Sequence, residues 1–250
     1  MQSSPVILLV AVCGIFLVFA AGFAVMVVTS RKDNEAYARI AQSLGFTPLE
    51  NTDELMQRIC FLRDIKPEPH HRLTHVYCRT HATGAKTCMY NLSFRSNSRA
   101  ASGSGRKSSY SPLESNAVAF ISPAWKLPLF STLLRVDGDG VMAKLGNTVL
   151  EKAVDIKHEI VKFPHIPKLD ELYIIFTPDS SPANVLPSDG FLRILAKYPN
   201  LDLHAGGDTF TLSFFDSKLK SPSEEKMKQL FKIGMELARE LGETHRSSLY

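Results

Sequence analysis

The longest uninterrupted run of hydrophobic residues lies close to the N-terminus. Residues 5–28 contain no charged and no strongly polar side chain. At about 1.5 Å per residue, a helix of this length reaches roughly 36 Å, which is enough to cross a hydrocarbon core of about 30 Å with some tilt. The pattern therefore predicts a transmembrane anchor over residues 1–30, which contacts the lipid bilayer through residues 5–28.

Two other interpretations of this run fit its flanks less well. A cleaved signal peptide would begin with a basic region and carry a shorter apolar core. Here no Lys or Arg precedes the run, which continues past the small residues Ala20, Ala21 and Gly22. Acylation at Cys13, as in a lipoprotein, would leave a second hydrophobic span after the cysteine. We therefore favour an uncleaved anchor in which Cys13 is a small apolar residue of the helix.

The basic residues near the run lie on one side of it. Arg31, Lys32 and Arg39 follow it, whereas no Lys or Arg precedes it. Because cytoplasmic flanks are enriched in Lys and Arg, we expect a single-pass protein of the cell membrane, with its N-terminus outside and its C-terminal domain in the cytoplasm. The later cysteines, an odd number at irregular spacing, favour free thiols in a reducing compartment; they are Cys60, Cys78 and Cys88.

A helical segment is predicted over residues 31–70. Residues 33–44 place their apolar side chains on one stripe, and a second short helix is predicted to begin at Asn51, whose side chain can cap it. Two prolines within residues 66–70 end this pattern and mark a loop.

A β-hairpin is predicted next. Residues 71–80 and 86–94 alternate apolar and polar side chains, and Thr83-Gly84 between them supplies the turn. In this register Cys78 and Cys88 lie directly across the ladder on one face, and His75 points to the other face.

The hairpin holds a cluster of residues with metal-type side chains: His75, Cys78, His81 and Cys88. A tetrahedral site would need all four on one side of the sheet, and a zinc ribbon would show closely spaced pairs at two knuckles. Because neither condition is met, we predict no metal ion and no cofactor, and two packed thiols on the sheet face.

Residues 95–111 are rich in Ser and Gly and contain no acidic residue, which predicts a flexible, exposed loop. Beside a membrane, its cations are candidates for contact with anionic headgroups; they are Arg95, Arg99, Arg106 and Lys107. Nucleic acid is not an expected partner, because only Tyr110 could stack on a base. The simplest interpretation is a solvated connection that binds nothing.

The remaining chain predicts an α+β fold, with antiparallel hairpins packed against helices in a soluble domain over residues 71–245. Strands are predicted at 117–122, 130–136, 172–176, 201–204 and 209–215, and helices at 141–154, at 189–197 and from Ser221 to Gly242. Residues 137–140 contain two Asp residues but lack the third acidic position and the distant Glu of a calcium loop. Residues 205–208 connect two strands, whereas a phosphate loop runs from a strand into a helix.

The order of these elements resembles that of a scattered group of uncharacterised bacterial proteins with one N-terminal membrane helix and a cytosolic α+β domain. The residues that carry the resemblance are Ala41-Gln-Ser-Leu-Gly45-Phe, Phe163-Pro-His165-Ile-Pro167 before Tyr173, the stretch from Leu192 to Gly207, and a last helix that begins with Pro. The resemblance implies an anchored α+β module and no site residues.

Composition and motifs favour a binding function. The net charge of +4 is spread along the chain, and no paired-carboxylate, nucleophile-elbow or phosphate-loop pattern occurs. We therefore expect a membrane-anchored binding or scaffold module on the cytoplasmic face, with a protein partner and without predicted catalytic residues. An enzyme stays open as an alternative because triad members can lie far apart in sequence. Binding of anionic lipid or nucleic acid through residues 95–111 is the other alternative.

Overall fold

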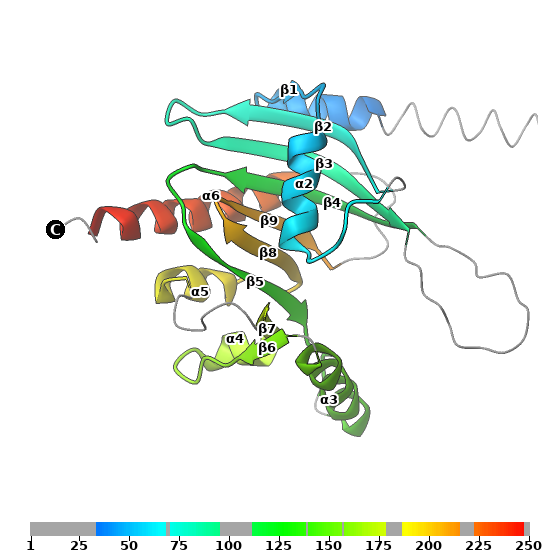
Figure 1. The fold of residues 1–250 in the computed structure, drawn as a ribbon, viewed down its shortest axis with the longest axis vertical. Helices are drawn as coiled ribbons and strands as arrows, with labels where there is room; N and C mark the ends of the chain where they lie inside the picture. Colours follow the sequence, from blue (N-terminus) through cyan, green and yellow to red (C-terminus); the bar gives the residue numbers. More distant parts are fainter. Residues whose placement is uncertain are drawn as a thin grey trace, which may run out of the picture.

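The computed structural model describes residues 34–68, 71–95, 112–138, 140–156, 158–178, 187–215 and 223–247. The predicted anchor, residues 5–28, lies outside these ranges. Within them, no helix combines the length and the apolar character that crossing a bilayer requires. The described chain is an α+β fold with one large antiparallel sheet and helices packed against it (Figure 1).

Nine strands of the described chain form the sheet, in the order β1-β2-β3-β4-β9-β8-β5-β7-β6. The strands are β1 (Thr47–Pro48), β2 (Arg72–Thr80), β3 (Lys86–Arg95), β4 (Pro112–Ile121), β5 (Leu127–Leu134), β6 (His158–Val161), β7 (Tyr173–Pro178), β8 (Leu201–Gly207) and β9 (Thr209–Phe214). β2, β3 and β4 form a meander, and the later hairpin of β8 and β9 is inserted between β4 and β5. The sequence predicts most of these strands but misses β1 and β6, which form the two edges of the sheet.

The first predicted hairpin is confirmed in its register. Cys78 lies opposite Cys88, and Gly84 in the turn has a φ of 80°, a left-handed conformation that costs glycine little. The second hairpin is tighter than predicted. Pairing continues to Gly206 and Thr209, so Gly207 and Asp208 form a two-residue turn instead of the predicted turn over residues 205–208.

The helices are residues 34–43, α2 (Asp53–Leu62), α3 (Val141–Asp155), α4 (Pro167–Leu172), α5 (Asp189–Leu195) and α6 (Glu224–Ser247). The N-cap position of α2 is Thr52, one residue after the predicted Asn51, and the Asn51 side chain accepts from the first-turn backbone N–H of Asp53 at 2.9 Å. The predicted end of α6 at Gly242 is wrong, since the helix continues to Ser247. A glycine costs an exposed helix only about 1 kcal/mol, which neighbouring helix formers offset. The predicted start at Ser221 lies outside the described residues.

Helices cover both faces of the sheet (Figure 1). On one face, residues 34–43, α4, α5 and α6 bury the larger core, which includes Phe120 and Phe210 with their rings stacked at 5.0 Å. α6 approaches this face closely, because a Cβ at Gly234 would lie 2.0 Å from the ring of Phe120. On the other face, Leu55 and Ile59 of α2 pack in a second core with side chains of β3 and β4.

Candidate functional site

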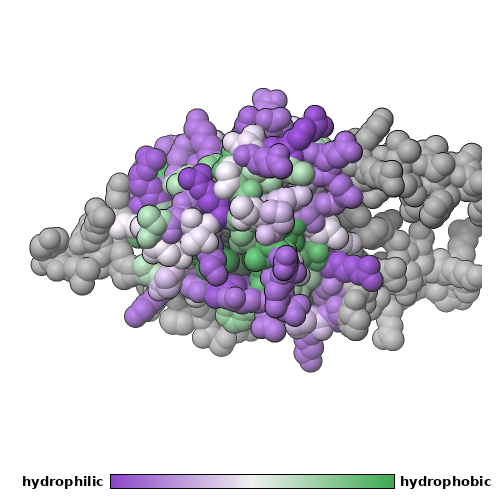
Figure 2. Space-filling model, turned by 90° about the horizontal axis from the view of Figure 1, so that it is seen from above, coloured by the Kyte–Doolittle hydropathy of each residue, from purple (hydrophilic) through white to green (hydrophobic). Residues whose placement is uncertain are grey.

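A hollow of about 390 Å³ lies between α2, β1 and the turn ends of the neighbouring strands. Its apolar lining includes Pro48, Leu49, Leu55 and Ile121. Figure 2 views the molecule from the side of β1 and shows hydrophobic side chains in a hollow with hydrophilic side chains around it. The volume falls in the range of about 300–1,000 Å³ that is usual for ligand pockets. We call this hollow the α2 groove.

An ion pair between Arg58 of α2 and Asp208 of the β8–β9 turn borders the α2 groove. The Arg58 guanidinium donates to the Asp208 carboxylate, to Thr209 Oγ1 at 3.1 Å and to Glu54 Oε1 at 2.9 Å. A second hollow of about 250 Å³, also bordered by Arg58 and Asp208, continues along α2 beside Phe61. The ion pair therefore lines both hollows.

Hydrogen bonding holds both members of this pair in their charged forms. The bond to Asp208 raises the pKa of Arg58 above its ordinary value, against the opposing effect of partial burial. Partial burial alone would raise the pKa of Asp208, but bonds from Arg58 and Thr209 outweigh it and lower that pKa. Asp208 therefore stays ionised, and Arg58 keeps a fixed orientation at neutral pH.

Lys86 adds a second cation to the rim of the α2 groove. Its side chain is exposed and, within the part of the chain that the structure describes, has no carboxylate partner. Arg58 and Lys86 carry two positive charges, and Glu54 and Asp208 carry two negative ones. The charges of these four rim residues therefore sum to zero.

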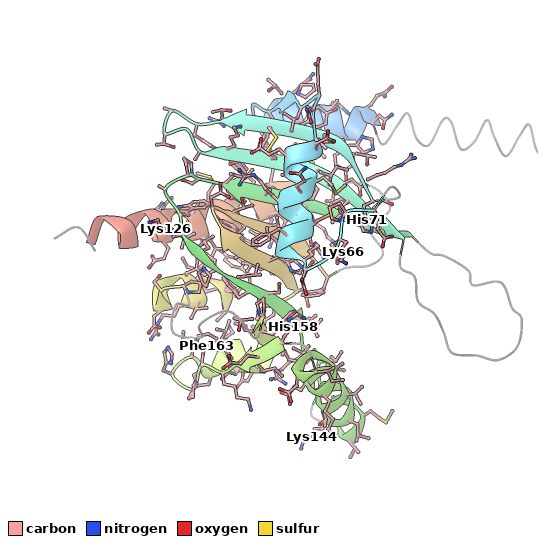
Figure 3. All side chains as sticks on the ribbon, in the orientation of Figure 1. Lys66, His71, Lys126, Lys144, His158 and Phe163 are labelled. Atoms are coloured by element: carbon pink, nitrogen blue, oxygen red, sulfur yellow. A yellow bond between two sulfur atoms is a disulfide. The ribbon has the colours of Figure 1, made fainter. Side chains whose placement is uncertain are left out.

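The prediction of free thiols at positions 78 and 88 is wrong. Cys78 and Cys88 form a disulfide between β2 and β3, visible as a yellow bond in Figure 3, and both line the α2 groove. The predicted register explains this outcome, because side chains directly opposite on one face of a ladder are close neighbours. Cys60, buried on α2, is the free cysteine of the described chain. The paired cysteines no longer support a reducing compartment, since disulfides persist mainly in oxidising ones.

The four residues of the metal-type cluster have separate surroundings. Cys78 is bonded to Cys88, the His75 ring stacks on Tyr37 at 4.5 Å, and His81 Nε2 lies 2.9 Å from Thr87 Oγ1. Across the described ranges, no group of three or more His, Cys, Asp or Glu side chains could hold a metal ion. His75 contacts the face that carries residues 34–43, opposite to that of Cys78, as predicted.

The predicted headgroup contacts fall largely outside the described residues. Arg95 is the last residue of β3 and pairs with Pro112 through the backbone. The side chain of Arg95 and all of Arg99, Arg106 and Lys107 lie outside the described part of the chain.

A buried polar network lies on the sheet beside the C-terminal end of α2. Ser131 Oγ lies 2.7 Å from His204 Nδ1, and His204 Nε2 lies 3.1 Å from Asp202 Oδ1. Asp202 also accepts from Arg63 at 2.9 Å and from Ser213 at 3.1 Å. Burial lowers the pKa of His204, so that its ring is neutral at neutral pH and its Nδ1 can accept from the Ser131 hydroxyl.

Ser, His and Asp also form the catalytic triads of serine hydrolases. If the protein were an enzyme, this network would be its candidate catalytic site. Ser131 lies within β5 between β7 and β8 and is only 7% exposed. The hollows beside α2 and beside Tyr198 do not reach it. The Nε2 N–H of His204 is also poorly aligned with the Asp202 oxygen, since Nε2 has no hydrogen-bond partner despite the 3.1 Å approach. The network therefore supports packing of α2 on the sheet and gives no argument for hydrolysis.

The α2 groove joins residues that sequence reasoning did not connect. Glu54 and Arg58, spaced by one helical turn, were a detectable pair, but Asp208 lies 150 residues from Arg58. Only the insertion of the β8–β9 hairpin beside β4 brings its turn next to α2. Comparison with protein-family models, with curated proteins and with solved structures finds no match to this chain.

Proposed function

We propose that the protein is a membrane-tethered binding module whose α2 groove receives an extended, mainly apolar polypeptide segment. The observation that carries the proposal is the groove itself, with its apolar lining and a rim of balanced charges. The tether is the uncharged run over residues 5–28, which is long enough to span a bilayer. A binding function also agrees with the burial of Ser131 in the triad-like network.

The position of the α2 groove favours a polypeptide over a compact small molecule. It lies between a sheet edge, formed by exposed Thr47 and Pro48, and the side of α2, and it continues beyond Arg58. Proteins often bind extended peptides along sheet edges and beside helices, where alternate side chains enter pockets. The apolar part would take such a side chain, and Lys86 and Glu54 would face the polar groups that flank it.

Peptide selection tests this function. We expect a displayed random peptide library, selected on the full chain in lipid nanodiscs and depleted on empty nanodiscs, to yield peptides that lose at least tenfold in affinity for Leu49→Asp. Tenfold corresponds to about 1.4 kcal/mol, which is within the contribution of one buried apolar contact. Met235→Asp, the matched control on the exposed side of α6, should bind within about twofold of the wild type. Failure to enrich peptides, or equal loss in both variants, would refute the groove as the binding site.

We further propose that the domain faces the cytoplasm, as the basic flank at Arg31, Lys32 and Arg39 favours. The Cys78–Cys88 disulfide favours the opposite side, and a cytoplasmic domain would hold this pair reduced for much of the time. We base the proposed orientation on the basic flank because Lys and Arg close to a membrane segment determine directly which end of the segment stays in the cytoplasm. An enzymatic reporter fused after Tyr250 is expected to be active only in the cytoplasm, and activity on the outer side would reverse the proposed orientation.

A further inference from the structure

Helix α3 packs on the domain through one face and leaves the opposite face exposed. On the inner face, Ala143 and Val154 are buried. Asn147 hydrogen-bonds to the backbone of Val136 at 2.7 Å and 3.1 Å, and Glu151 pairs with Arg135 at 2.8 Å. These contacts fix the rotation of α3 about its own axis, so the identity of the residues on its outer face is determined.

The outer face of α3 is apolar and exposed. Its side chains are 55% to 81% exposed and follow a helical period, with spacings of three, four and seven residues; they are Val141, Met142, Leu145, Val149 and Ile156 at the C-cap. α3 projects from the β6 end of the sheet (Figure 1), and Lys144 extends from it away from the sheet (Figure 3). A contiguous exposed stripe of this kind marks an interaction site more often than scattered apolar residues do.

We propose that the outer face of α3 lies in the headgroup region of the bilayer to which residues 5–28 attach the chain. The inference rests on the proposed membrane tether and adds a second contact with the same membrane. A helix whose exposed face combines apolar side chains with lysines binds in this region with its apolar side chains buried about 5–10 Å deep. Lys144 and Lys152 are exposed and would meet anionic headgroups, at about 1 kcal/mol per charge.

The chain that precedes the described residues places the domain near this membrane. Residues 29–33 alone separate the apolar run from residue 34, and five residues span at most about 18 Å. Residues 34–43 contact β2 and α3 adjoins β6 at the opposite edge of the sheet, so binding of α3 is an intramolecular step when both edges lie along the bilayer. A modest affinity of the exposed face for lipid is therefore sufficient.

A second copy of the chain fits the outer face less well than lipid does. If α3 of two copies paired as a coiled coil, residues 142, 149 and 156 would occupy one of the two core positions of the heptad repeat. Residues 145 and 152 would occupy the other. Helix pairing would therefore bury the charge of Lys152 in the seam. At a bilayer surface, the same side chain can bury its methylene groups and extend its ammonium to the headgroups.

Spin labels on the full chain test the proposal. The free thiols are removed by Cys13→Ala and Cys60→Ala, and a nitroxide is attached at Val149→Cys or, as a matched exposed control, at Thr83→Cys in the β2–β3 turn. The protein is reconstituted in vesicles of phosphatidylcholine and phosphatidylglycerol, and collisions with oxygen and with a water-soluble nickel chelate are compared. We expect the oxygen-to-nickel ratio to be several-fold higher at position 149 than at position 83, because oxygen concentrates in lipid and the chelate stays in water.

Each other outcome overturns a defined part of the proposal. Equal ratios at the two positions, in protein that floats with the vesicles, would refute the α3 contact and leave the tether intact. Dipolar broadening between labels at position 149 would show that the outer face of α3 contacts a second copy of the chain and not lipid. Failure of the chain to float after alkaline extraction would refute the tether itself and the α3 contact with it. Leu145→Glu, introduced with the label at position 149, should lower the ratio toward the control value without releasing the chain from the vesicles.

Discussion

Replacement of Arg63 by Met is expected to lower the free energy of unfolding by about 3 kcal/mol. Arg63 and Asp202 lie 2.9 Å apart, with side chains only 15% and 14% exposed. Burial alone would raise the pKa of Asp202, but its interactions with neighbouring side chains, Arg63 among them, outweigh burial and hold that pKa well below its usual range. Without Arg63 the carboxylate stays buried and loses its permanently charged partner. Denaturant unfolding of the full chain in detergent at neutral pH measures the effect.

Two further variants show whether burial is the cause. Arg58→Met breaks the pair with Asp208, whose side chains are 28% and 34% exposed, so it should cost at most about 1 kcal/mol. Adding Asp202→Asn to Arg63→Met should recover part of the loss, because a neutral amide needs no cation. Equal losses for Arg58→Met and Arg63→Met would show that the buried network does not stabilise the packing of α2 on the sheet.

Reduction of the Cys78–Cys88 disulfide is expected to lower the free energy of unfolding by about 3 kcal/mol. The bond closes a loop with a sequence separation of 10, and it stabilises the fold mainly by restricting the unfolded chain. Unfolding midpoints of the full chain with and without a dithiol reductant measure the effect. Mass spectrometry after alkylation confirms that the bond is open.

The double variant Cys78→Ala/Cys88→Ala should match the reduced protein and should not respond to the reductant. Cys60→Ala is the matched control, because this buried thiol lies outside the bond and the variant should respond as the wild type does. An unchanged midpoint after complete reduction would show that the disulfide contributes nothing to stability.

Local pattern predicts those elements in which periodicity extends over several residues. The alternation over residues 71–80 and 86–94 predicts both the hairpin and the strand register in which Cys78 lies opposite Cys88. A helical period likewise predicts α3 within one residue of its observed end at Asp155. β1 and β6 have two and four residues, too few for a period to be recognised, and they were missed. The same length limit explains the missed α4, which has six residues.

The candidate sites depend on contacts that no local pattern contains. The pairs Arg58–Asp208 and Arg63–Asp202 span 150 and 139 residues and exist because the β8–β9 hairpin lies beside β4, under α2. The sequence by itself determined the uncharged run over residues 5–28, the first hairpin and the amphipathic helices, since each follows from side chains close together along the chain. Only the tertiary structure decided the strand order, the disulfide bond, the α2 groove and which face of α3 stays exposed. These features depend on which elements pack together, and burial of apolar surface, the main driving force of packing, is not directional and leaves no local trace in the sequence.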